Sequence, residues 1–361
     1  MIEHLPAKWQ EKLASLGFTK TTPIQDQLFE PLSAGHNVLG ISPTGSGKTL
    51  AYLWPLLLQL KPKAAQQLLI LAPNSELAGQ LFEVTKIWAE PLGLTPQLLL
   101  SGSSQKRQIE RLKKGPEIII GTPGRVCELV KLKKVKMMNI KTIVLDEYDE
   151  LLSDSQAQFV TKISHYVPKD YQMVYLSATQ KISSDHLAQE TKVIDLSEQE
   201  ETSIAHYYIS VDKRDRLNLL RQLANIPDFR GLAFFNSLAD LGAVEERLQF
   251  SGSSAVSLAS DVNVKMRKTI LERFKAKQLS LLLATDLVAR GIDIDSLETV
   301  INFDIPRDRD TYTHRAGRTG RMGKEGQVIS LVTHKEDLKK LKKMAKVTEL
   351  QLKNQVLSLK S

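Results

Sequence analysis

A run of small residues from Ser42 to Thr49, SPTGSGKT, has the composition of a loop that binds phosphates. It follows the apolar run NVLGI and precedes the helical pattern TLAYLWPLLLQL, which is the context that such a loop requires. We expect Lys48 to reach the β and γ phosphates of a nucleoside triphosphate, and the Thr49 hydroxyl to hold Mg²⁺. Glycines let backbone N–H groups turn toward phosphate oxygens. The rest of the predicted loop is Thr44, Gly45, Ser46 and Gly47.

The loop departs in one place from the pattern G-x-x-x-x-G-K-T, which has glycine where Ser42 stands here. This departure counts against a generic kinase or GTPase. When the loop is considered alone, the alternative interpretation is a turn that matches the phosphate-binding pattern by chance.

Two adjacent acids, Asp146 and Glu147, follow the apolar run KTIVL. Acids at the end of a buried strand repel each other, so a cation is a natural compensation. Asp146 is expected to hold Mg²⁺, directly or through water, and Glu147 to orient and deprotonate the attacking water. The alternative for this pair alone is a helix cap.

These residues are carried by short apolar runs that alternate with helical patterns, which indicates βαβ units and parallel sheets. The first series consists of residues 37–41, 67–73, 117–123, 141–147, 172–179 and 192–196. The second consists of residues 206–211, 231–237, 253–259, 279–286, 299–304 and 326–332. Open parallel sheets bind ligands beyond the carboxyl ends of their strands, so two such sheets predict a cleft between two α/β domains.

A length of 361 residues suits two such domains. The polar stretch Ser197–Ser203 predicts the hinge, so we assign residues 1–197 and 205–345 to the domains, 198–204 to a linker and 346–361 to a short tail. From Lys335 onward, lysines between leucines predict an amphipathic helix. Its lysines form either a solvated face or an extension that contacts RNA.

The amino-acid composition further restricts the class of protein. No stretch is apolar enough to span a membrane and no export signal is recognised, so a soluble cytoplasmic protein is expected. The single cysteine, Cys127, excludes an internal disulfide and a cysteine-rich zinc cluster. A net charge of +8 and a pI near 9.3 suggest a polyanionic partner.

From Gly17 to about Val332 the sequence resembles the DEAD-box RNA helicases. The motifs that carry the likeness are GFTKTTPIQ, SPTGSGKT, DEYD, SAT, ARGIDI and HRAGRTGR, in that order along the chain. The resemblance implies two tandem RecA-like domains, with ATP and Mg²⁺ as cofactors and RNA as the partner. It also implies that Gln25 pairs with the adenine edge, with Phe18 in support. Tyr148 replaces the alanine of the family motif.

In the second half, the resemblance implies that Arg318 and Arg321 reach the γ-phosphate as arginine fingers. Asp293 would contact the ribose, and His314 would join the network near the γ-phosphate. Ser177 and Thr179 of SAT would couple the nucleotide state to unwinding.

The residues that the resemblance assigns to RNA carry hydroxyls, guanidinium groups and turn amides, which bind phosphates without reading sequence. In the first half they are Pro73, Gly102, Gln108, Thr122, Pro123, Gly124 and Arg125. In the second half they are Asn236, Ser237, Arg267, Thr285 and Arg290. Ser75 and Val264 stand where the family usually has arginine and glutamine, so modest RNA affinity is expected.

The sequence therefore predicts an ATP-dependent RNA helicase, expected to be monomeric, that closes on ATP and RNA and separates short duplexes. An ATP-gated RNA clamp or assembly scaffold and a DNA helicase are the alternatives. The compact form resembles short bacterial members of the family, several of which act in ribosome assembly, so ribosomal precursor particles are a further expected partner.

Overall fold

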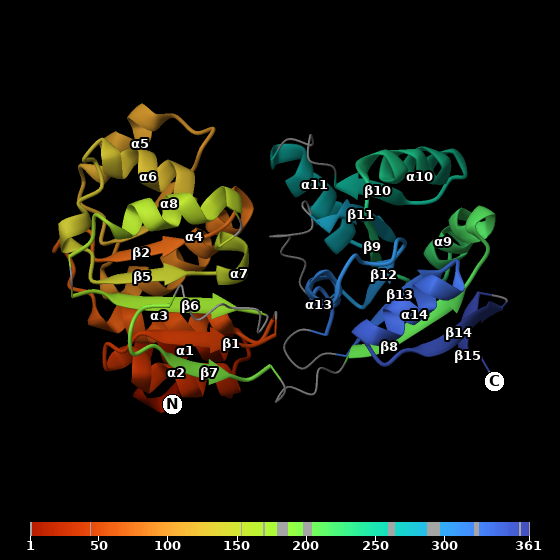
Figure 1. Cartoon of the computed structure of the whole chain (residues 1–361), viewed down its shortest axis with the longest axis horizontal. Coiled ribbons are helices and arrows are strands. Elements are labelled where there is room, and N and C mark those ends of the chain that lie inside the picture. Colours follow the sequence, from red (N-terminus) through yellow and green to blue (C-terminus); the bar gives the residue numbers. More distant parts are fainter. Residues whose placement is uncertain are drawn as a thin grey trace. The chain divides into compact units, whose positions relative to one another are not determined.

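The protein is described here from a computed structural model, which divides into two compact units, Met1–Glu200 and Glu201–Ser361 (Figure 1). The structure describes residues 2–43, 45–152, 154–168, 170–178, 187–197, 204–258, 264–286, 297–320, 325–353 and 355–360. No helix within these ranges is long and apolar enough to cross a membrane.

Unit 1 contains a seven-stranded parallel sheet in the order β3-β4-β2-β5-β6-β1-β7. The strands are β1 (Val38–Ile41), β2 (Leu68–Leu71), β3 (Pro96–Leu99), β4 (Ile118–Gly121), β5 (Thr142–Leu145), β6 (Gln172–Ser177) and β7 (Lys192–Asp195). The helices of eight or more residues are α1 (Ala7–Ser15), α2 (Pro23–Ser33), α3 (Lys48–Gln59), α4 (Ser75–Ala89), α5 (Gln105–Leu112), α6 (Pro123–Lys131) and α8 (Asp154–Ser164). The short helix α7 covers Tyr148–Leu151.

Both faces of this sheet are covered, so its central strands are apolar throughout. Leu68 and Ile70 of β2 pack with α1 to α4, whereas Leu69 and Leu71 pack with α6, α7 and α8 on the other face (Figure 1). This alternation follows from the two-residue period of a strand. It explains why β2, β4 and β5 appear in the sequence as continuous apolar runs.

Unit 2 contains an eight-stranded sheet in the order β10-β11-β9-β12-β13-β8-β14-β15. The strands are β8 (Ile204–Ser210), β9 (Gly231–Phe235), β10 (Ala255–Leu258), β11 (Leu281–Thr285), β12 (Thr299–Asn302), β13 (Gly326–Val332), β14 (Thr348–Lys353) and β15 (Val356–Leu359). The helices are α9 (Arg216–Ala224), α10 (Leu238–Phe250), α11 (Val264–Lys275), α13 (Arg309–Ala316) and α14 (Lys335–Met344). Only β15 pairs antiparallel among the described strands.

The predicted fold class, two mostly parallel sheets flanked by helices, is confirmed. The lysine-rich helix is α14, and it buries Leu341. Residues 348–353 and 356–359 lie in the predicted short tail, but they form the paired strands β14 and β15 on the edge of the second sheet. The hairpin is held because Leu350, Leu352 and Leu357 pack against the core of unit 2.

Candidate active site

Most of the predicted site residues of unit 1 follow the carboxyl ends of its strands, which lie at one edge of a parallel sheet. The phosphate loop follows β1, Asp146 follows β5, and Ser177 ends β6. These three strands are neighbours in the order β5-β6-β1. The phosphate loop, Asp146 and Ser177 are therefore brought together, although Ser42 and Ser177 are 135 positions apart in the chain.

The phosphate loop is joined to the sheet and shaped by its glycines. Ser42 donates its backbone N–H to the carbonyl of Ser177 at 3.1 Å, which connects the loop to the SAT segment. Gly47 has a φ of +91°, and a Cβ there would come within 2.5 Å of the Gln25 amide nitrogen. Both the backbone angle and the packing therefore require glycine at this position.

Lys48 is buried at the start of α3, and its ammonium is held inside the loop. Its Nζ donates to the carbonyls of Ser42 at 2.6 Å and Pro43 at 2.9 Å. The charge of Lys48 therefore lies within the loop whose backbone is expected to surround the phosphates. Thr49 is the next residue of the same helix and is half-buried.

Gln25 lies on α2, directly beside the phosphate loop. Its Oε1 accepts from the Thr22 N–H at 3.0 Å, and its Nε2 donates to the Gly47 carbonyl at 3.4 Å. The residue predicted to sense adenine therefore also braces the loop that would hold the phosphates. Phe18, its predicted support, is half-buried and packs against the core that contains α2.

Asp146 is a buried carboxylate, 4% exposed, with few groups to stabilise its charge. Its Oδ2 accepts from the Tyr52 hydroxyl at 3.0 Å and its Oδ1 from the Glu147 N–H at 3.0 Å. Burial and then the Glu147 carboxylate raise the pKa of Asp146 to about 7, while Lys48 and the Tyr52 hydroxyl act in the opposite direction. A cation beside Asp146 would remove this penalty.

Tyr52 is a site residue that the sequence analysis missed. It is completely buried on α3, four positions after Lys48, so both side chains lie on the same face of the helix. Burial raises the pKa of its hydroxyl well above the usual value, which keeps the hydroxyl protonated as a donor to Asp146. The spacing from Lys48 is the sequence signal that could have identified it.

The residues present fit Mg²⁺, the cation that the family resemblance implies. Among the described residues no group of three or more His, Cys, Asp or Glu could form a complete metal site. Mg²⁺ does not require one, because it is commonly held by one or two protein oxygens together with substrate phosphates and water. Asp146 and Thr49 offer such oxygens.

Glu147 has an unusual backbone, with a φ of +52° at the start of α7. This left-handed conformation costs a non-glycine residue about 1 kcal/mol and is often found at functional sites. Its carboxylate oxygen Oε2 is buried and accepts no hydrogen bond from the described protein. An acceptor of this kind could bind and activate a water molecule.

Tyr148, the residue that replaces alanine in DEYD, belongs to the core and not to the exposed site. It is completely buried, and its ring lies 4.7 Å from that of Tyr175 on β6. The Tyr175 hydroxyl in turn accepts from the Ala188 N–H at 2.9 Å. The substitution therefore fills space behind the acids, between β6 and the strand end that carries Asp146.

The residues of unit 1 predicted to bind RNA follow the other strands of the same edge. Pro73 follows β2, Gly102 follows β3 and Thr122 follows β4, and these strands are neighbours in the order β3-β4-β2. The next residues along, Pro123, Gly124 and Arg125, form the first turn of α6. One sheet edge therefore carries the expected RNA residues on one half and the expected nucleotide residues on the other.

Two of these residues hold the loop after β3 in place. Arg125 is 9% exposed and donates from Nε to the Leu100 carbonyl at 3.2 Å and from a terminal nitrogen to Ser103 at 3.3 Å. Gln108 is also buried, and it donates to the Leu100 carbonyl at 2.8 Å. Both side chains therefore position the backbone around Gly102.

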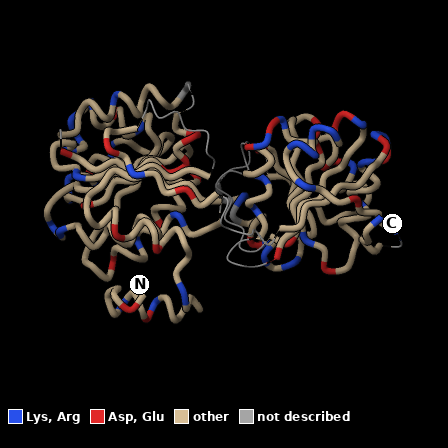
Figure 2. The backbone as a smooth tube through the Cα atoms, turned by 60° about the horizontal axis from the view of Figure 1, so that its bottom comes forward, with Lys and Arg blue, Asp and Glu red and all other residues tan. Residues whose placement is uncertain are grey.

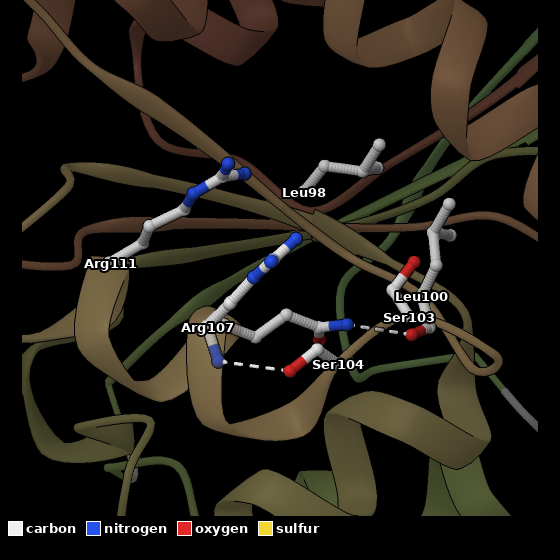
Figure 3. A pocket seen from close by; sticks show the side chains of 7 residues that line it. Leu98, Leu100, Ser103, Ser104, Arg107 and Arg111 are labelled. Carbon is white, nitrogen blue, oxygen red and sulfur yellow. Dashed lines mark hydrogen bonds between the residues drawn. The ribbon is translucent and has the colours of Figure 1, made fainter.

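A cavity of about 350 Å³ opens between this loop and α5 (Figure 3). Leu98, Leu100, Ser103, Ser104, Arg107, Gln108 and Arg111 line it. The guanidinium groups of Arg107 and Arg111 extend from α5 over this surface (Figure 3). Arg107 lies within the segment 101–108 that the family resemblance assigns to RNA, although it was not predicted individually, and Arg111 lies three residues beyond that segment.

Unit 2 is organised around Arg315, a second residue that the sequence analysis missed. Arg315 is 1% exposed and forms a bidentate ion pair with Asp286, at 2.6 and 2.7 Å. It also donates to the side-chain oxygens of Asn302 at 3.2 Å and Asn236 at 2.8 Å. Its position inside HRAGRTGR was the available signal, but only the fold distinguishes this buried arginine from its neighbours.

Three of the other predicted residues of unit 2 lie at the carboxyl ends of its strands. Asn236 and Ser237 follow β9, and Thr285 ends β11. Asn236 donates to the Ile305 carbonyl at 3.0 Å, and Ser237 caps α10. Arg267 lies on α11, His314 lies on α13, and Arg318 follows α13. Thr44, Thr179, Arg290, Asp293 and Arg321 lie outside the described residues.

Comparisons with known proteins agree with this geometry. The family model DEAD/DEAH box helicase matches residues 22–186, and the helicase conserved C-terminal domain matches residues 215–323. The probable ATP-dependent RNA helicase YfmL of Bacillus subtilis is 42% identical over 317 residues, which cover 86% of this chain and 84% of that protein. The DEAD-box ATP-dependent RNA helicase CshC of Bacillus cereus is 38% identical, covering 88% and 84%.

Solved structures show the same likeness. The structure of Dbp5 from S. cerevisiae bound to RNA and ADP BeF3 has a TM-score of 0.84 and 26% identity, covering 96% of this chain and 94% of that chain. A DEAD box protein from Methanococcus jannaschii has a TM-score of 0.60 and 28% identity, covering 96% and 98%. Because the two family models together match most of the chain, and these relatives are 42% and 38% identical over most of their length, the chain belongs to the DEAD-box family of ATP-dependent RNA helicases.

Proposed function

We propose that this protein hydrolyses ATP when RNA is bound and uses the cycle to separate short RNA duplexes or to remodel RNA–protein complexes. The observation that carries the proposal is the division of one sheet edge in unit 1. Expected RNA residues follow β3, β4 and β2, and expected nucleotide residues follow β5, β6 and β1. A shift in one group of strand-end loops can therefore be transmitted to the other through adjacent strands.

In this proposal Gln25 selects adenine and supports the loop, and Lys48 exchanges its loop carbonyls for the β and γ phosphates. Glu147 holds the attacking water and accepts its proton. Asp146 and Thr49 would hold Mg²⁺, which neutralises charge on the phosphate oxygens when it is bound. Arg318 and Arg321 supply positive charge to the γ-phosphate in the ATP-bound state.

RNA is gripped through its backbone by the loops after β2, β3 and β4. Arg125 and Gln108 keep the loop around Gly102 in a defined shape, so its backbone groups are preorganised for phosphates. We propose that Arg107 and Arg111, beside the cavity, add charge to this grip. The likeness to Dbp5 solved with RNA and ADP BeF3 supports both partners.

Strand separation follows because ATP-driven closure would bend the bound strand, and a bent strand cannot remain in a continuous duplex. Opening costs about 1.4 kcal/mol per base-pair step on the DNA stacking scale, so only short helices would be displaced in each cycle. We propose that the protein acts in the cytoplasm as a monomer. Ribosomal precursor particles are its proposed RNA-containing partner. Normal ribosomal subunit profiles at low temperature in a deletion strain would contradict that last assignment.

The experiment that tests the function is ATP hydrolysis with and without single-stranded RNA. Matched single-stranded DNA and Lys48→Ala are the controls. Stimulation by RNA alone, absent in the variant, is the expected result. RNA binding without hydrolysis that depends on Lys48 would replace the helicase with an ATP-gated clamp, and equal stimulation by DNA would indicate a DNA helicase.

A further inference from the structure

Unit 1 carries a group of lysines at the edge where its strands begin, opposite the edge that carries the active site. Three loops contribute them, and these loops precede β2, β4 and β5, which are adjacent in the sheet. Neighbouring strands are about 4.8 Å apart, so the first residues of the three strands lie within roughly 10 Å of one another and their loops leave the same edge side by side. We call this group the lysine platform. It consists of the exposed residues Lys61, Lys63, Lys113, Lys114, Lys134 and Lys136. Figure 2 marks the backbone positions of lysine and arginine in blue.

Buried polar side chains hold the loops of the lysine platform in place. Gln67, 2% exposed, accepts from the Lys61 N–H at 3.1 Å and donates to the Lys61 carbonyl at 2.8 Å. Glu117, 3% exposed, accepts from the Lys63 N–H at 2.6 Å. Gln66, 1% exposed, accepts from the Lys136 N–H. Each such bond adds about 0.5–1.5 kcal/mol, so the loops have a defined shape.

The backbone of the same loops includes left-handed residues where glycine would be less strained. Lys63 has a φ of +62°, and Lys133, two residues after the end of α6, has a φ of +55°. A lysine in this region costs about 1–2 kcal/mol relative to the usual conformation. Backbone strain of this kind is concentrated at functional sites. The loops therefore combine strain with a concentration of charge.

The positive charges of the lysine platform are not neutralised within the part of the chain that the structure describes. None of its six lysines forms an ion pair with a described acid. The nearest acid in the buried network, Glu117, is used by the backbone N–H groups of Lys63 and Thr95. Charges within a Debye length of about 10 Å repel one another, so a polyanion would relieve the repulsion.

A basic path along α5 connects the lysine platform to the RNA loop. Helix α5 begins after the loop that contains Gly102 and ends just before Lys113. Arg107, Arg111 and Lys114 are spaced four and three residues apart, so they follow one face of the helical turns. Eight residues of helix span about 12 Å, which is close to the length of a four-residue strand at about 13 Å. The path therefore runs from one sheet edge to the other.

We propose that the lysine platform is a second RNA-binding surface, which holds the phosphate backbone of a duplex or folded segment that continues from the strand gripped by the loops after β2, β3 and β4. This inference rests on the proposed function, in which RNA is the substrate. RNA fits better than an acidic protein because α5 leads to the platform from the RNA loop. The segment is held through phosphates alone, without sequence readout.

The test compares two RNAs on the full-length protein. One is a single strand of roughly 8 nucleotides, within the range that one binding site covers. The other is the same strand joined to a long hairpin. Each is titrated at several salt concentrations against wild type and the variant K61Q/K113Q/K134Q/K136Q. The control variant, K8Q/K12Q/K213Q/K353Q, removes the same charge from exposed lysines outside both the lysine platform and α14.

We expect the platform variant to lose about tenfold in affinity for the hairpin RNA, with its salt slope reduced by about 2 to 4. Its affinity for the short strand, and its ATP hydrolysis on that strand, should stay within twofold of wild type. The control variant should keep the hairpin affinity. Failure of the proposed function would give a different result: the short strand would not stimulate ATP hydrolysis by the wild-type protein.

Three results would overturn the proposal: equal hairpin binding by wild type and platform variant, an equal loss in the control variant, or an equal loss on the short strand. Polyglutamate that competes for the hairpin only in wild type would assign the surface to an acidic protein instead. A lysine acylation footprint on wild-type protein avoids any folding defect of the variant. Lys134 and Lys136 should be protected by the hairpin and not by the short strand, and equal reactivity would again refute the proposal.

Discussion

Replacing Tyr52 with phenylalanine removes one hydroxyl from the centre of the nucleotide site while keeping the ring that fills the core. That hydroxyl donates to Asp146 at 3.0 Å, and both groups are buried. A hydrogen bond to a charged partner contributes about 1.5–3 kcal/mol, because the carboxylate has lost its water. We therefore expect Tyr52→Phe to lower the free energy of unfolding of unit 1 by that amount when Asp146 is ionised.

The matched control is Tyr148→Phe, which lies on the other side of the same acids. The Tyr148 hydroxyl is buried but has no hydrogen-bond partner in the described structure. Removing this hydroxyl breaks no hydrogen bond within the described structure. The free energy of unfolding should therefore stay equal or rise by about 1 kcal/mol. The two variants delete the same atom, and only the partner differs.

The assay is urea unfolding at about pH 8, above the Asp146 pKa of about 7, without nucleotide or Mg²⁺. Tryptophan fluorescence reports unit 1 alone, since all 3 tryptophans, Trp9, Trp54 and Trp88, lie in it. The difference in free energy of unfolding between the two variants should become smaller at about pH 5, because protonated Asp146 accepts a weaker hydrogen bond. Equal losses from Tyr52→Phe and Tyr148→Phe would refute the assigned role of the hydrogen bond.

Three further predictions concern separate parts of the protein. Glu147→Gln should lower ATP turnover by about 10²- to 10⁴-fold with nucleotide binding retained, and full activity would exclude Glu147 as the base. Arg315→Gln should lower the free energy of unfolding of unit 2 by about 3–5 kcal/mol, because it leaves Asp286 unpaired and the buried side-chain oxygen of Asn302 without its donor. Urea unfolding followed by circular dichroism measures this loss, and a loss under about 1 kcal/mol would contradict the prediction. Burial lowers the pKa of His206, so unit 2 should lose stability as the pH falls below about 6.5, where the unfolded chain takes up a proton that the folded His206 resists. His206→Phe should remove that loss, and an unchanged pH profile would show that another group is responsible.

The sequence by itself predicted those features that are encoded locally. The phosphate loop, the acid pair and the apolar strands follow from residue order over a few positions, because turn chemistry and strand period act over that range. The edge strand β3 was not predicted, since one face of it is only half-buried and its apolar pattern is weak. The strands of the β14–β15 hairpin were missed for the same reason, as lysines and glutamines alternate with their leucines.

Only the tertiary structure decided which distant residues meet. Tyr52 reaches Asp146 across 94 positions, and Arg315 reaches Asn236 across 79, through contacts that no local pattern records. The lysine platform exists because β4, β2 and β5 are neighbours in the sheet although they are not consecutive in the chain. In the sequence its lysines look like three ordinary solvated loops. Strand order makes them a single surface, because crossover connections bring separate loops to the same sheet edge.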